Sequence, residues 1–263
     1  MAESQRPPGA GSPADGAHAS LKATGLYETL MPERERVARA CRVMGKLDLT
    51  RSTFGHISLR VPGHDLILIR ARGPGESGIR YTSADDIILV DLDGRKVAGR
   101  DDLHVPKEVF IHTALLKARP ALGSVLHAHP STVVLFSICG VPLLPLVGAF
   151  DPSCLRLVND GIANYPRSVL IHNEELGRDL ASVMREARSC VMRGHGVTTL
   201  GATVEDAVLD AIRLNDLADL NYRARLLGTP EPIAQEDMAF FEQVDVGSND
   251  PYWRYYCRLT GEN

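Results

Sequence analysis

The sequence lacks long apolar runs, an excess of positive charge and closely spaced cysteine pairs. A membrane-spanning helix needs about 20 consecutive apolar residues, so we expect no membrane partner. Lys and Arg total 29 against 33 Asp and Glu, and the net charge of −4 provides no basic field to attract nucleic acid. The five cysteines are odd in number and scattered, which is typical of free thiols in a reducing cytoplasm. We therefore expect a cytoplasmic protein without a nucleic-acid partner.

The chain does contain enough apolar material for a folded core, since hydrophobic residues make up 44% of its 263 residues. Residues 1–24 are rich in Pro, Gly, Ala and Ser and carry no apolar stretch of the kind found in targeting peptides. Such a composition predicts a disordered N-terminal tail. Residues 25–263 are expected to form a single domain.

The residue pattern predicts short strands first and then an alternation of helices and strands. A helix is expected over 32–46, where apolar residues recur at helical spacing. Two-residue alternation predicts strands over 52–61 and 65–71 and a hairpin over 87–99. The later predicted helices are 106–120, 130–140, 174–187, 203–227 and 251–259, and the later predicted strands are 124–129, 168–171 and 189–201. These elements fit one α/β domain with helices on both faces of a mixed sheet.

His127 and His129 provide the first chemical signal. Side chains at positions i and i+2 of a strand point to the same side, so the two imidazoles would project together and could share a cation. Pro130 begins the next helix, which puts the pair where a strand ends, a usual position for a site in an α/β fold. The pair alone is a weak signal, because ordinary core or surface histidines give the same pattern.

His195 strengthens this interpretation. It stands in the sequence Arg193-Gly194-His195-Gly196, after a strand-like apolar run. Glycines on both sides allow close approach of the backbone and a turn that aims the imidazole. A hairpin turn that merely contains a histidine is the alternative. Three histidines would leave a position on the cation open for a substrate, as in catalytic metal sites.

Glu108 is the candidate acid/base. On the helix predicted over 106–120 it lies one turn from His112, so the two would share a face. A carboxylate beside a metal ion can ligate the ion or exchange protons with the substrate. The alternatives are a solvated surface glutamate and a packed histidine.

Several segments together resemble the class II aldolase/adducin-head family. They are GHIS, SADDIILVDLDG, HVPKEVFIHTALLKARP, VLHAHP and RGHG, and the resemblance spans roughly Met31 to Gly228. It implies a three-layer α/β/α class II aldolase-like domain with a mixed, largely antiparallel central sheet. The family's metal ligands match His127, His129 and His195. Its catalytic acid/base precedes the first ligand by 19 residues, a spacing that matches Glu108.

The chain departs from the family's sugar-phosphate aldolases where these bind phosphate. His56 stands in place of an asparagine, RARGPGE replaces a Thr-Pro-Ser-Gly type of turn, and Pro106-Lys107 replaces a pair of serines. The remaining polar groups suit a carboxylate or an acidic aromatic compound better than a phosphate. The candidate substrate contacts are His56, Ser58, Arg60, Lys107 and His112.

The HVPKE and VLHAHP segments look closer to those of the family's decarboxylases, which act on dihydroxylated aromatic acids such as 3,4-dihydroxyphthalate, than to those of its sugar-phosphate aldolases. The resemblance therefore implies a metal-dependent carbon–carbon lyase, most similar to a decarboxylase, that acts on a small anionic organic substrate. The divalent metal is Zn, Fe, Mn or Co, with zinc slightly preferred. Family members are commonly tetramers, so we expect a homotetramer in which a neighbouring subunit completes the site.

Three other functions stay open from the sequence. An aldolase would use the same cation to stabilise an enediolate formed from a hydroxy-carbonyl or sugar-phosphate substrate. Iron(II) held by the same histidines, with Glu108 as a carboxylate ligand, would suit a non-haem oxygenase. Adducin-type members are non-catalytic interaction modules and lack the metal histidines, whereas this chain has all three.

Overall fold

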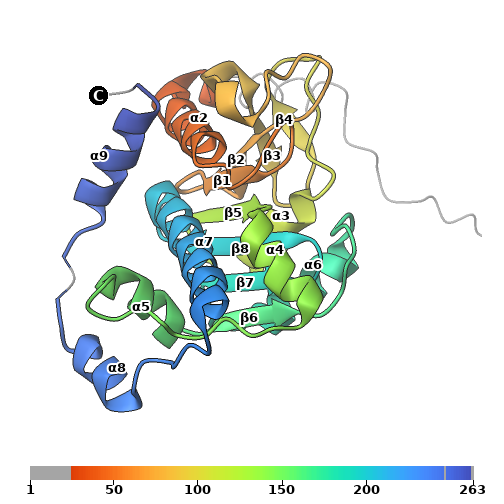
Figure 1. Ribbon diagram of the computed structural model, residues 1–263. Coiled ribbons are helices and arrows are strands. Elements are labelled where there is room, and N and C mark those ends of the chain that lie inside the picture. The colour runs from red at the N-terminus through yellow and green to blue at the C-terminus, as the bar shows by residue number, and fades with distance from the viewer. Residues whose placement is uncertain (1–24, 246, 262–263) are drawn as a thin grey trace, which may run out of the picture.

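A central eight-stranded sheet organises the computed structural model, which describes residues 25–245 and 247–261 (Figure 1). The strand order is β4-β3-β2-β1-β5-β8-β7-β6. All neighbouring pairs are antiparallel except β6 and β7, which are parallel. The predicted α/β fold with a mixed, largely antiparallel sheet is confirmed. The tail predicted over residues 1–24 lies outside the described residues.

The strands are short, and those between the two edges of the sheet are largely buried on both faces. Their bounds are β1 His56–Arg60, β2 Leu66–Arg70, β3 Ile87–Asp91, β4 Lys96–Ala98, β5 Ser124–Ala128, β6 Ile162–Tyr165, β7 Ser189–Met192 and β8 Gly196–Gly201. Because successive side chains of a strand alternate between faces, Val125 and Leu126 of β5 enter two different cores. His127, two positions after Val125, therefore lies on the same face of the sheet as Val125.

Helices cover both faces of the sheet. Their bounds are α2 Met31–Lys46, α3 Val109–Ala118, α4 Ser131–Cys139, α5 Pro152–Asn159, α6 Glu174–Met184, α7 Val204–Leu227, α8 Gln235–Glu242 and α9 Asp250–Leu259. The core that contains Leu126 packs beneath α2, α4 and α7, which cross the near face of the sheet in Figure 1. The core that contains Val125 packs beneath α3 and α6 on the opposite face. None of the described helices is long and apolar enough to span a bilayer.

Two local predictions are wrong. Residues 168–171 form an irregular segment rather than a strand, and the parallel edge strand β6 lies just before them. Pro166 ends β6, and the backbone N–H of Ile171 donates to the Glu108 carboxylate instead of to a neighbouring strand. The helix predicted over 106–120 begins at Val109, so Glu108 is its N-cap residue and does not lie within the helix.

Packing of the β5 core can be tested with a matched pair of leucines. Leu126 is fully buried beneath α7, whereas Leu227 at the end of that helix is 92% exposed. We expect Leu126→Ala to lower the free energy of unfolding by about 3 kcal/mol, because it removes buried methyl groups and leaves a cavity. Leu227→Ala should change it by less than about 0.5 kcal/mol. Urea unfolding followed by circular dichroism measures both, and equal losses would contradict the described packing.

Candidate metal centre

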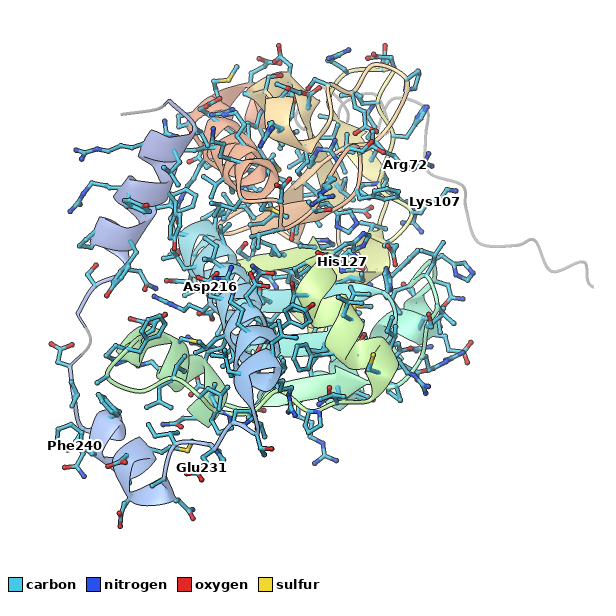
Figure 2. The ribbon with its side chains drawn as sticks, viewed as in Figure 1. Arg72, Lys107, His127, Asp216, Glu231 and Phe240 are labelled. Atoms are coloured by element: carbon cyan, nitrogen blue, oxygen red, sulfur yellow. The ribbon has the colours of Figure 1, made fainter. Side chains whose placement is uncertain are left out.

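His127, labelled in Figure 2, and His129 meet at the carboxyl end of β5. His127 lies on the α3 face of the strand, and His129 follows immediately after the strand ends. Their Nε2 atoms are 2.9 Å apart. The Nδ1 atom of His127 lies 3.0 Å from the Val197 carbonyl oxygen, an acceptor, so Nδ1 carries the proton and Nε2 presents a lone pair.

His195 reaches the same point from the turn between β7 and β8. Its ring centroid lies 4.8 Å from that of His127 and 5.3 Å from that of His129. Gly194 adopts a positive φ of 61°, which glycine allows without strain. At Gly196 an added Cβ would stand 2.2 Å from the Ala128 carbonyl oxygen, so only glycine fits. The two glycines thus aim His195 at the end of β5.

Glu108 completes the group from the start of α3. Its Oε1 accepts a 2.9 Å hydrogen bond from the Ile171 backbone N–H. Its Oε2 lies 3.6 Å from Nε2 of His127 and 3.4 Å from Nε2 of His195. Burial opposes the charge of this carboxyl, but the neighbouring histidines and the Ile171 amide outweigh burial and lower its pKa to about 2. Glu108 is therefore ionised at neutral pH.

The arrangement fits a divalent cation. One ligand atom from each of Glu108, His127, His129 and His195 lies within 4.8 Å of the others. Ligand atoms bound tetrahedrally to zinc at about 2.1 Å stand about 3.4 Å apart. Here the Nε2 atoms of His127 and His129 are 2.9 Å apart, and Glu108 Oε2 lies 3.4 Å from Nε2 of His195. Both ring nitrogens of His195 are buried without a hydrogen-bond partner among the described residues. A bound cation would satisfy one of these nitrogens.

The electrostatics of the site favour neutral imidazoles, the form that binds metal. Burial lowers the pKa of His127 well below its ordinary value, and the neighbouring histidines lower it further, although Glu108 acts in the opposite direction. Burial and His195 likewise lower the pKa of His129. His127 and His129 therefore present lone pairs at neutral pH.

The structure brings some of the predicted substrate contacts to this centre. His56 on β1 lies opposite His127 in the strand register, and their ring centroids are 5.2 Å apart. Ser58 and His112 are fully buried, and hydrogen bonds connect them in series to His56.

Arg60 and Lys107 behave differently. Arg60 sits at the far end of β1, about 13 Å along the strand from His56, where its guanidinium donates to the carbonyl oxygens of Leu122 and Leu116. The structure therefore does not bring Arg60 to the centre. Lys107 is exposed and lies toward the edge of the molecule from His127 in Figure 2, although it directly precedes Glu108 in the chain.

Sequence reasoning missed two parts of the site. The Ile171 amide fixes Glu108, and no side chain marks a backbone donor in a sequence. Phe54 is 59% exposed, and its ring centroid lies 5.6 Å from that of His129. The sequence signal for Phe54 was an aromatic residue immediately before the Gly55-His56 pair.

The geometry agrees with the comparisons. The family model described as Class II Aldolase and Adducin N-terminal domain matches residues 35–222. A 3,4-dihydroxyphthalate decarboxylase from Arthrobacter keyseri is 39% identical, and the alignment covers 84% of this chain and 91% of that protein. A Terrabacter enzyme of the same name is 38% identical, with 87% and 97% covered. The solved L-fuculose 1-phosphate aldolase from Glaciozyma antarctica shares the fold, with a TM-score of 0.73, 22% identity and 97% and 95% covered.

Metal content tests the centre. We expect the wild-type protein to bind about one divalent ion per chain. His195→Ala should bind zinc at least about tenfold more weakly, because it removes one of three imidazoles. The matched control is His64→Asn, which changes an exposed histidine in the β1–β2 turn. Zinc titration against a competing chelator measures both affinities, and equal affinity of His195→Ala and His64→Asn would contradict the assignment.

Proposed function

Because this chain belongs to the family of class II aldolases and adducin N-terminal domains, we propose that it is a divalent-metal-dependent lyase that decarboxylates a dihydroxyphthalate-like aromatic acid. One observation carries the proposal. Glu108 converges with His127, His129 and His195 in a chain that is 39% identical to a decarboxylase of that substrate.

The three histidines would hold the cation and leave part of its surface open to the substrate. A divalent cation in that position supplies Lewis acidity, which draws electron density from substrate oxygen atoms. In the reaction the carbon–carbon bond to the carboxylate breaks and its electron pair stays on the ring carbon. A proton then replaces the departing carbon dioxide on that carbon.

Glu108 is the group that we assign to proton transfer. Its low pKa keeps it ionised, so it can accept a proton from a substrate hydroxyl. The same proton can be returned to the ring carbon after carbon dioxide leaves. The Ile171 N–H holds one carboxylate oxygen and leaves the other beside the histidine nitrogens, where the substrate would bind.

The surroundings of the centre support an aromatic acid. The exposed Phe54 ring beside His129 offers an apolar face on which a flat ring can pack.

Further parts of the proposal concern the metal, the assembly and the location. Imidazole ligands suit zinc, iron, cobalt and manganese, and we favour zinc slightly. We propose a homotetramer in the cytoplasm. Large exposed apolar side chains such as Phe150 (81% exposed) and Tyr81 (70% exposed) support burial against other subunits.

Aldol cleavage is the second candidate, because the family includes aldolases and the same cation and carboxylate would serve that reaction. It would be favoured by cleavage of a sugar phosphate without action on hydroxy-aromatic acids. An oxygenase would require dioxygen. An anaerobic assay with 3,4-dihydroxyphthalate therefore separates the decarboxylase from both alternatives, because release of carbon dioxide without oxygen supports only the decarboxylase.

Substitution of Glu108 tests its role in that assay. We expect Glu108→Gln to reduce kcat by about 100- to 10,000-fold, because the amide cannot exchange the proton. The amide oxygen can still accept from the Ile171 N–H, so zinc content should match that of the wild type. His64→Asn serves again as the control and should retain full activity. A Glu108→Gln enzyme with wild-type kcat would overturn the assignment.

A further inference from the structure

A buried chain of hydrogen bonds leads from the strand layer to the candidate metal centre. His56 Nδ1 and His112 Nε2 are 2.6 Å apart. On the other side of the ring, His112 Nδ1 lies 2.8 Å from Ser58 Oγ. Ser58 Oγ is in turn 3.5 Å from the Val125 carbonyl oxygen, which can only accept. Ser58 and His112 are fully buried, so water does not offer them other partners.

Both imidazoles of this chain are buried, and their hydrogen-bond partners are uncharged. His56 Nδ1 faces His112 Nε2, and His112 Nδ1 faces the Ser58 hydroxyl, so no carboxylate is hydrogen-bonded to either ring. A buried charge without such a partner is costly, which favours the neutral form of both rings. A neutral imidazole carries one N–H and one bare nitrogen, so each ring has to choose between two tautomers.

The direction of the chain follows from counting hydrogen bonds. If Ser58 donates to the Val125 carbonyl, His112 Nδ1–H donates to Ser58 and His56 Nδ1–H donates to His112, and all three contacts are formed. If the chain ran the other way, the Ser58 proton would point to His112 and the contact with Val125 would be lost. Buried polar groups favour the arrangement that satisfies more of them. His112 and His56 are therefore both Nδ1–H tautomers.

We infer that this chain fixes His56 as a hydrogen-bond acceptor that recognises a substrate hydroxyl group. With Nδ1 protonated, Nε2 of His56 carries a lone pair and has no hydrogen-bond partner among the described residues. The His56 ring stands beside His127 and remains 8% exposed. A nitrogen lone pair accepts a hydrogen bond from a hydroxyl group, and it repels an oxyanion such as a phosphate or carboxylate oxygen.

The inference rests on the proposed function, because it assigns one substrate contact at the same site. It also explains a departure of the sequence. An asparagine at position 56 would offer an N–H₂ donor as well as a carbonyl oxygen, whereas His56 in this tautomer offers only an acceptor. His56 therefore selects a compound with a free hydroxyl near the cation, as a dihydroxylated aromatic ring has.

Nitrogen-15 NMR of the histidine-labelled protein tests the tautomer without substrate or activity. We expect His56 to show a protonated Nδ1 and a bare Nε2, with the His56 resonances identified by their absence from His56→Phe. In cadmium-loaded protein, the ligand nitrogens should couple to the metal and His56 Nε2 should not. A protonated Nε2, or a cadmium coupling to it, would overturn the inference.

Ligand binding tests the recognition of the hydroxyl. Calorimetry would compare 3,4-dihydroxybenzoate with 3-hydroxybenzoate and 4-hydroxybenzoate in zinc-loaded wild type and His56→Phe. We expect His56→Phe to weaken binding of the dihydroxy compound at least about tenfold. Binding of one of the two monohydroxy compounds should weaken less than about twofold. Equal weakening of all three compounds would overturn the inference. Failure of the proposed function is distinct, since it would appear as a wild-type enzyme that releases no carbon dioxide.

Discussion

The antiparallel pairing of β5 with β1 and β8 is the constraint on which the site depends. The register places His127 of β5 between two partners, His56 on β1 and Thr198 on β8. A slip of one residue in either pair would turn every side chain of β5 to the other face of the sheet. The buried cores on both faces oppose such a slip, because it would move Leu126 and Val125 into each other's places. The apolar packing therefore fixes the position of the histidines.

Burial of so many polar groups has a consequence for chemistry. Imidazoles and a carboxylate this deep lose hydration, and folding tolerates them only if they stay neutral, pair or hold a cation. Here His127 is neutral with its Nδ1 bonded to a carbonyl oxygen, and Glu108 is charged and held by an amide. Within the described part of the chain, neither ring nitrogen of His195 has a hydrogen-bond partner, and a cation at this site would provide a partner for one of them.

Much of this was predictable from the sequence. The i, i+2 period of a strand predicts that His127 and His129 converge, and the glycines around His195 indicate the turn that brings it close. The family resemblance and the fold class are confirmed by the comparisons. The differences between prediction and structure have a common cause, since local pattern does not encode tertiary partners. Apolar residues 168–171 resemble a strand but supply an amide to Glu108, and Arg60 shares a strand with His56 but lies at its opposite end.

The central claim is that the three histidines form one open metal site for a hydroxy-aromatic acid. X-ray absorption spectroscopy at the zinc edge tests this claim most directly. The zinc-loaded protein should show three imidazole ligands at about 2.0–2.1 Å. Addition of 3,4-dihydroxybenzoate should change the oxygen ligands and leave the imidazoles in place. Fewer than three imidazoles, or a spectrum that does not respond to the aromatic acid, would contradict the account.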